Sequence, residues 1–356
     1  MKIQNRNSRF IVSPSAKTII LMVLALSALM FSTAAALAAS GYHEINRFKL
    51  GGEGFWDYLT FDPSGNRVFI SRGTHVMVVD AKSGKVVGDI PDTPGVHGIA
   101  LAPESHRGFT SNGRNATVTI FDLENLKTLG SVTTEAGPDA IIYDSKTQSV
   151  LTMNGRGQSA TVIDAATGKV KGSVPLGGRP EFAQADGKGK VFINLEDKSE
   201  QVELDPAALK VTRRWSLAPC EEPSGLAIDR QHRRLFAGCH NKMMAVVDID
   251  AGKVIATPAI GQGVDANGFD PATQFAFSSN GDGTLTVVHE DSPDKFTVVE
   301  NVKTAPRART MTLDEKTHNV FLVTAEFGPA PTATTENPRP RPPMLPDSFV
   351  LLVFGR

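Results

Sequence analysis

Short apolar segments that end in a polar turn recur along the chain at a nearly constant spacing. The segments YLTFDPSGN, IIYDSKTQS and MTLDEKTHN show the pattern: a few residues that alternate in polarity run into an Asp, and turn-forming residues follow. Alternation over this length predicts a β-strand that ends in a turn. The turn residue recurs at seven equivalent positions: Asp62, Ala102, Asp144, Asp186, Asp229, Asp270 and Asp314.

Three further strand-like segments follow the first one in each repeat. In the first repeat they are VFISRG, VMVVD and KVVGDI. Four strands in a unit of about 42 residues are typical of a propeller blade. Because a lone four-stranded sheet leaves both faces in water, such blades must stack in a ring. The sequence therefore predicts an all-β, seven-bladed β-propeller with four antiparallel strands per blade.

The two ends of the chain complement each other. The last repeat stops after its third strand, at residues 348–354, whereas a surplus strand-like segment, YHEINRFKL, precedes the first repeat at residues 42–50. We expect this N-terminal strand to complete the last blade, because closing the ring removes open edge strands. A solenoid with loose ends is the alternative, and it leaves both the deficit and the surplus unexplained. The propeller is thus predicted as a single domain over residues 40–356.

The first 39 residues are typical of a secretory signal peptide. A basic start without acidic residues precedes an apolar run over residues 19–31, and small residues follow over 34–39. An uncleaved membrane anchor is the alternative. No later segment approaches 18 apolar residues, so we expect no membrane span after cleavage. The predicted location is periplasmic or secreted.

Charge and cysteine content exclude several classes of protein. The chain has 37 Lys and Arg against 38 Asp and Glu, and this balance does not support nucleic-acid binding. No CxxCH motif occurs, which excludes a covalently attached haem. The two cysteines, Cys220 and Cys239, flank the first two strands of the fifth repeat at ends that share one face. We therefore expect a disulfide between them in an oxidising compartment, with two separate thiols as the alternative.

One set of candidate binding residues follows from the ring symmetry. Five residues before each turn position, the chain places mostly polar side chains that converge on the channel axis. The positions that we single out are Asp57, His97, Asp139, Glu181, Asp265 and Arg309. The four carboxylates Asp57, Asp139, Glu181 and Asp265 would repel each other unless a cation, shared protons or nearby arginines compensate. This predicts a divalent-cation site or a polar-ligand site at the channel mouth, and a merely solvated channel is the alternative.

Basic residues in the loops between second and third strands form a second candidate set on the same face. Arg114 and Arg156 belong to it, and Arg179 lies close by in sequence to Glu181. Such side chains suit a carboxylate or phosphate group, and scattered solvated charges are the alternative. Trp56, beside Asp57, either forms an apolar wall of the binding site or packs within its blade. Residues 326–347 hold seven prolines and predict an extended insertion on the channel face, which serves as a lid, a docking arm or a tolerated loop.

The second-strand motifs VFISRG, GFTSNG, VLTMNG and AFSSNG resemble the YVTN repeat. Together with the TGK-type turns and the export signal, they make residues 42–356 similar to the YncE-like, YVTN-repeat seven-bladed propellers of bacteria. This resemblance implies the propeller fold. It implies little about activity, because the matching residues belong to strands and turns.

The absence of nucleophile, metal-spacing and cofactor motifs favours an exported, non-catalytic binding or scaffolding propeller. We expect it to be a monomer that binds a small polar ligand or another protein at the channel face. A metal-dependent lactonase or hydrolase, resembling gluconolactonase-type propellers, is one alternative, although those enzymes have six blades. An accessory subunit of a periplasmic redox enzyme is another.

Overall fold

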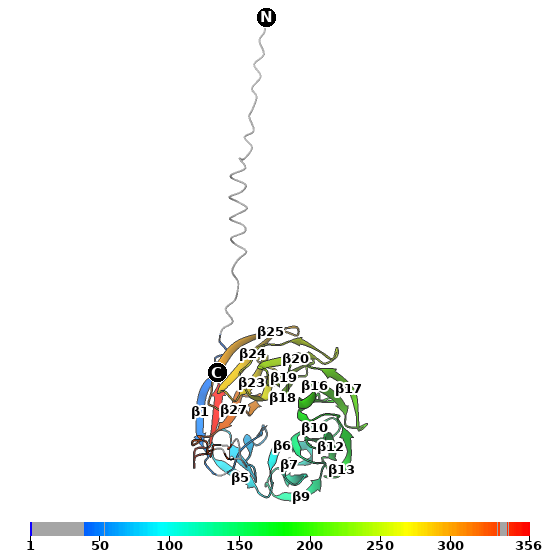
Figure 1. Cartoon of the computed structure of the whole chain (residues 1–356), viewed down its shortest axis with the longest axis vertical. Helices are drawn as coiled ribbons and strands as arrows, with labels where there is room; N and C mark the ends of the chain where they lie inside the picture. The colour runs from blue at the N-terminus through cyan, green and yellow to red at the C-terminus, as the bar shows by residue number, and fades with distance from the viewer. Residues whose placement is uncertain (2–38, 53, 333, 335–339, 341) are drawn as a thin grey trace. The chain divides into compact units, whose positions relative to one another are not determined.

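A computed structural model describes residues 1, 39–52, 54–332, 334, 340 and 342–356. Residues Ala39–Arg356 form one compact unit of seven four-stranded antiparallel sheets. Figure 1 shows these sheets arranged as the blades of a ring. The predicted all-β, seven-bladed propeller is therefore confirmed. Most of the predicted signal peptide, and residues 333, 335–339 and 341 of the proline-rich insertion, lie outside the described residues.

Each of the first three blades uses consecutive strands, from the innermost to the outermost. Blade 1 comprises β2 (Leu59–Asp62), β3 (Arg67–Ser71), β4 (Val76–Asp80) and β5 (Val86–Ile90). Blade 2 comprises β6 (Val96–Ala102), β7 (Arg107–Asn112), β8 (Thr117–Asp122) and β9 (Thr128–Thr133). Blade 3 comprises β10 (Pro138–Asp144), β11 (Ser149–Asn154), β12 (Ser159–Asp164) and β13 (Val170–Pro175).

Blades 4 to 6 repeat this order. Blade 4 comprises β14 (Pro180–Ala185), β15 (Val191–Leu195), β16 (Glu200–Asp205) and β17 (Lys210–Ser216). Blade 5 comprises β18 (Pro223–Asp229), β19 (Arg234–Cys239), β20 (Met243–Asp248) and β21 (Lys253–Ala256). Blade 6 comprises β22 (Val264–Asp270), β23 (Phe275–Asn280), β24 (Thr284–Ser292) and β25 (Lys295–Lys303). Two short 3-10 helices, η1 (Pro103–Ser105) and η2 (Glu196–Lys198), lie in connections.

Blade 7 closes the ring with strands from both ends of the chain. Its inner strands are β26 (Met311–Asp314), β27 (Asn319–Thr324) and β28 (Val350–Gly355), and β1 (His43–Lys49) pairs antiparallel with β28. Tyr42, just before β1, is buried against Phe277 of blade 6, and its hydroxyl donates to the carbonyl of His318 at 2.8 Å. The predicted closure of the last blade by the N-terminal strand is confirmed.

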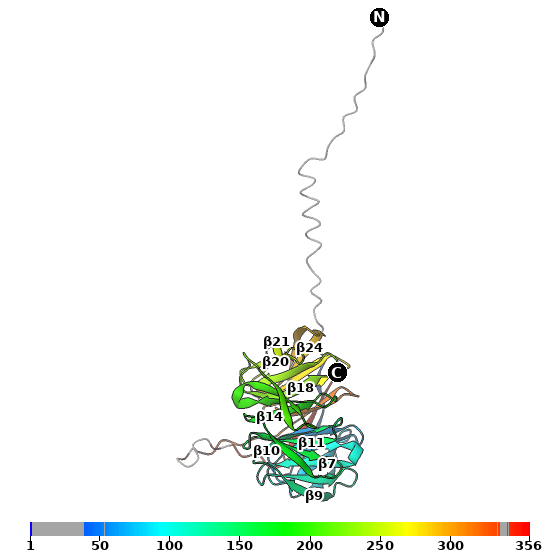
Figure 2. The ribbon, with the colours of Figure 1, turned by 90° about the vertical axis from the view of Figure 1, so that its right-hand side faces the viewer.

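Aromatic side chains join neighbouring blades. Phe69 of blade 1 lies 5.9 Å from Phe121 of blade 2, and Phe236 of blade 5 stacks on Phe269 of blade 6 at 5.1 Å, measured between ring centroids. The middle strands are buried on both faces because a neighbouring sheet covers each face. Seen edge-on in Figure 2, the innermost strands β10 and β14 lie side by side. The core is thus a series of layers between blades, and the innermost strands surround the channel.

The recurring Asp at the end of the first strand closes the following turn. A carboxylate oxygen of Asp144 accepts hydrogen bonds from the backbone N–H of Thr147 at 3.1 Å and from its hydroxyl at 2.6 Å. Asp314 makes a similar bond with the Thr317 hydroxyl at 2.6 Å. These bonds satisfy backbone donors in the turn, which explains why six of the seven repeats carry Asp at this position.

No helix of the described residues is long and apolar enough to cross a membrane.

Candidate functional site

The structure places the predicted axial residues at one end of the innermost strands. His97, Asp139, Glu181 and Asp265 are each the second residue of the first strand of their blade, whereas Asp57 and Arg309 come two residues before β2 and β26. The ring therefore brings these side chains toward the channel from six blades.

A serine of the second strand holds the backbone of the axial residues in place. The Ser71 hydroxyl oxygen accepts from the backbone N–H groups of Asp57 and Tyr58, at 3.1 and 3.0 Å. In blade 2 the buried Ser111 hydroxyl accepts from Gly98 N–H at 2.9 Å and donates to the carbonyl of Asp139 in blade 3. The Ser of the repeated SNG motif thus fixes an axial residue of the next blade. The sequence motif was visible, but its role required the pairing of blades.

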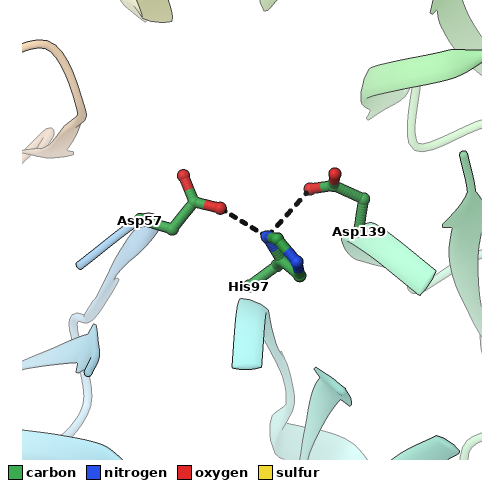
Figure 3. Close-up of side chains that lie close together, drawn as sticks. All are labelled: Asp57, His97 and Asp139. Carbon is green, nitrogen blue, oxygen red and sulfur yellow. Dashed lines mark hydrogen bonds and ion pairs between the residues drawn. The ribbon is translucent and has the colours of Figure 1, made fainter. Parts of the chain in front are cut away.

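The axial residues of blades 1, 2 and 3 form a group joined by one hydrogen bond and one longer ion pair, shown in Figure 3. The His97 Nδ1 atom lies 2.6 Å from Asp57 Oδ2 and 3.6 Å from Asp139 Oδ1, so one imidazole bridges two carboxylates. Burial by itself would lower the pKa of His97. The hydrogen bond to Asp57 and the charge of Asp139 outweigh burial and raise this pKa to about 9, so the ring is an imidazolium cation at neutral pH.

The other axial carboxyl groups are held in different states by their neighbours. Burial raises the pKa of Asp139 to about 6, although the charge of His97 opposes the shift. Burial also raises the pKa of Asp265 to about 7, against the effect of Arg309, whose Nε lies 3.2 Å from Asp265 Oδ2. For Glu181, burial, the charge of Asp139 and a hydrogen bond with Glu196 raise the pKa to about 10. Glu181 is therefore a neutral carboxylic acid at pH 7.

Two aromatic residues meet beneath the axial carboxyl groups. Tyr58 and Phe182, each one position after an axial residue, stack with ring centroids 4.7 Å apart, although they come from blades 1 and 4. The Tyr58 hydroxyl is buried without a hydrogen-bond partner. Burial and the charges of Asp139 and Glu181 raise its pKa well above the usual range. The two rings also line a cavity of about 860 Å³. This cavity extends toward Asp62, at the far end of the first strand of blade 1.

A cavity of about 460 Å³, which we call the arginine pocket, opens over the axial residues of blades 2 to 4. Its ionisable lining residues are Arg114, Arg156, Arg179, His97, Asp139 and Glu181. The predicted basic set and part of the predicted acidic set therefore share one cavity. This volume lies within the range of small-molecule sites, about 300–1,000 Å³.

The arginine pocket does not contain every predicted residue. Arg309 and Trp56 line a different cavity, of about 400 Å³, together with Arg307 and Phe327. Trp56 also packs on Phe349, with ring centroids 5.3 Å apart. Among the described residues, the axial group whose potential metal-ligating atoms lie within 4.8 Å of one another is Asp57, His97 and Asp139. Glu181 and Asp265, which we had predicted as metal ligands, do not belong to this group.

Sequence reasoning missed Glu196, Tyr58 and Phe182. Glu196 lies in η2, outside the repeated positions, and reaches the site by pairing with Arg179 at 2.6 Å. A signal for the other two existed in the repeat itself. The position after the axial residue is aromatic in blades 1 and 4 and small elsewhere: Gly98, Ala140, Gly225, Ala266 and Thr310. At Gly98 and Gly225 a Cβ would collide with Ile141 and Asn267 of the next blade, so the close packing of neighbouring first strands keeps these two positions small.

Cys220 and Cys239 form a disulfide in the structure. Both residues are buried. Cys220 precedes β18 and Cys239 ends β19, so the bond joins two strand ends at the channel face of blade 5.

The chain matches no protein-family model, and comparison with curated proteins finds no significantly similar sequence.

Proposed function

We propose that the protein is an exported, non-catalytic binding propeller that holds a small polar ligand in the arginine pocket. The observation that carries this proposal is the pocket itself, in which three arginines share one cavity with the half-buried ionisable groups His97, Asp139 and Glu181. Ionisable groups in a cleft whose pKa values are shifted by burial and by specific charged neighbours concentrate at functional sites. The proposed export rests on the signal-peptide pattern of residues 1–39.

The repeat motifs support a relation to the YncE-like, YVTN-repeat propellers. Their serine, in VFISRG, GFTSNG and AFSSNG, aligns the axial backbone rather than facing a ligand. The resemblance therefore concerns the scaffold, and the residues that would select a ligand are the ones that vary between repeats. This is the pattern expected of a common fold that carries a particular site.

A retention experiment tests the binding function. The purified mature protein is incubated with a small-molecule extract of the periplasm and passed through gel filtration, and the retained compounds are identified by mass spectrometry. We expect retention by the wild type and by Arg47→Gln, a control on the outer strand β1 whose arginine pairs with Glu44. The double variant Arg114→Gln/Glu181→Gln should retain none. Equal retention by the double variant, or no retention by the wild type, contradicts the proposal.

A metal-dependent hydrolase is the second candidate, favoured by the group Asp57, His97 and Asp139. These residues offer two carboxylates and one imidazole, a donor set that suits Zn²⁺ or Mn²⁺. We place it second because the imidazole already bonds to Asp57, so an ion would compete with His97 for both carboxylates. The test is lactone hydrolysis after chelation and reloading with Mn²⁺ or Zn²⁺. Activity that requires the ion and is lost in Asp139→Asn would favour this candidate over simple binding.

A further inference from the structure

The lining of the arginine pocket has two parts: three exposed arginines, which we call the rim, and the half-buried side chains of His97, Asp139 and Glu181, which we call the floor. Arg114, Arg156 and Arg179 come from blades 2, 3 and 4, and all three side chains line the same cavity. The floor residues His97, Asp139 and Glu181 come from the same three blades. The ligand class therefore depends on the balance of charge between the rim and the floor.

The backbone is shaped to receive the arginines. Gly95 and Gly137 occupy equivalent positions two residues before the axial residue, with φ of +69° and +68°. A Cβ on Gly95 would lie 2.9 Å from Arg114 Cβ, and one on Gly137 would lie 3.2 Å from Arg156 Cγ. A side chain at either position would therefore displace the arginine. A positive φ at this position also occurs at Glu222, Gly263 and Arg307, so the conformation belongs to the repeated turn. The absence of a side chain at Gly95 and Gly137 leaves room for the two arginines.

Two of the three guanidinium groups are also held in position. Arg156 Nη2 donates to the carbonyl of Gly113 at 2.8 Å, and Arg179 Nη2 pairs with Glu196 Oε2 at 2.6 Å. Each of these bonds uses one nitrogen of a group that carries five N–H donors, so donors remain for a ligand. Positioned guanidinium groups lose less entropy on binding and suit the planar, bidentate geometry of oxyanions.

The floor does not cancel the positive charge of the rim. His97 pairs with Asp57, from which its Nδ1 lies 2.6 Å, and Arg179 pairs with Glu196. The side chains of Arg114 and Arg156 form no salt bridge with a described residue, so no carboxylate contact balances their charges. Cationic groups thus outnumber anionic ones, which favours an anion over a divalent cation in this cavity.

The floor also suits hydroxyl groups. Glu181, beside its hydrogen bond to Glu196, and Asp139 offer carboxyl oxygens as acceptors, and His97 offers Nε2 in addition to the Nδ1 that lies beside Asp57. A ligand that carries both an oxyanion and hydroxyls can therefore place its charge at the rim and its hydroxyls on the floor.

We propose that the ligand of the arginine pocket is a small hydroxylated oxyanion, a sugar acid or a sugar phosphate, whose charged group is bound by Arg114, Arg156 and Arg179. This inference rests on the proposed binding function and specifies its ligand class.

Isothermal titration with three matched sugars tests the inference: glucose, glucuronate and glucose 6-phosphate. We expect at least one of the two anionic sugars to bind at least tenfold more tightly than glucose at pH 7, and the carboxylate and phosphate arms identify which oxyanion is preferred. The Arg114 side chain makes no hydrogen bond or ion pair with another described residue, so Arg114→Gln should leave the fold intact and reduce this preference at least tenfold. Arg47→Gln should leave it unchanged. Circular dichroism and a thermal melt of each variant show whether it is folded.

Several outcomes would overturn the inference. They are equal affinity for glucose and the anionic sugars, an unchanged preference in a folded Arg114→Gln variant, and no binding of either anionic sugar at 10 mM. Retention of a neutral compound or a metal ion in the experiment of the previous subsection, lost in the double variant, would keep the binding function and reject the oxyanion. No retention at all would reject the binding function itself.

Discussion

At the scale of single residues, equivalent positions in the repeat acquire different chemistry from their neighbours. Asp57 shares the imidazole of His97 with Asp139, Asp265 faces Arg309, and Glu181 hydrogen-bonds to Glu196. The same carboxyl group is consequently ionised in one blade and protonated in another at pH 7. The repeat supplies the position, and side chains from adjacent blades and loops decide the protonation state.

A buried carboxyl group away from the pocket makes stability depend on pH. Glu290 accepts from His232 at 2.9 Å, and burial and the charge of Asp229 raise its pKa to about 7, although His232 opposes the shift. The folded state therefore binds this proton more tightly than the unfolded state, where the pKa is about 4.3. The resulting stabilisation is complete below pH 4 and is lost as the pH rises through 7. Compared with wild type, Glu290→Gln should lose less free energy of unfolding between pH 5 and 8, measured by urea denaturation. Parallel pH profiles would contradict this assignment.

We predict that Ser111, the serine of an SNG motif, stabilises the fold through the same hydrogen bonds that hold the backbone of Asp139 beside the pocket. Ser111→Ala removes a buried hydroxyl that bonds to Gly98 and Asp139, and leaves those backbone groups with one partner fewer. We expect a loss of about 1–3 kcal/mol in the free energy of unfolding. Ser83→Ala, which removes an exposed hydroxyl that bonds to Asp80, is the matched control and should cost less than about 1 kcal/mol. Equal losses in both variants would show that Ser111 has no special role.

At the scale of elements, closure of the ring depends on one strand from the N-terminal end. β1 pairs with β28 along its length, and Tyr42 inserts between blades 6 and 7. Loss of one buried aromatic side chain lowers the free energy of unfolding by about 3–5 kcal/mol. Deleting residues 42–50 removes Tyr42 and a whole strand, so it should lower this free energy by more. A thermal melt of the deletion variant measures the loss, and adding a peptide of residues 42–50 in trans should restore part of it. A deletion variant that melts with the parent would contradict closure by β1.

The disulfide is a second constraint at this scale. It joins Cys220 and Cys239, which are 19 residues apart in sequence. Replacing both by Ser should lower the free energy of unfolding by about 3 kcal/mol through the loop entropy of the unfolded chain. A reductant should lower the stability of the wild type by a similar amount and leave the double variant unchanged. Labelling of two free thiols in unreduced, denatured protein isolated from cells would show that the bond does not form in the cell.

At the scale of the whole molecule, the arginine pocket belongs to three blades at once, so an occupant joins them. A ligand that binds only the folded ring stabilises it by mass action, about 2.7 kcal/mol at a concentration one hundred times the dissociation constant. The preferred anionic sugar should therefore raise the melting temperature of the wild type and of Arg47→Gln. It should not do so for Arg114→Gln/Glu181→Gln. A shift of equal size in all three proteins would indicate a nonspecific salt effect.

The sequence by itself determined the features that repeat. Seven regularly spaced turns, six of which carry Asp, the alternation of each strand, and the surplus strand over residues 42–50 were enough to predict the blades, their number and the closure. These features depend on local pattern and on the need to cover both faces of every sheet. The same symmetry predicted that Asp57, His97, Asp139, Glu181, Asp265 and Arg309 meet near the channel.

Tertiary structure decided what the symmetry leaves open. It placed Arg114, Arg156 and Arg179 in one cavity with Glu181, and it put Trp56 and Arg309 in another. It also brought Glu196, in η2, to Arg179. In addition, it stacked Tyr58 of blade 1 on Phe182 of blade 4, although the two blades are not neighbours in the sequence. Repetition in a sequence specifies which positions are equivalent. Distances between unlike side chains from different blades, and hence charge and protonation, follow only from how the blades pack.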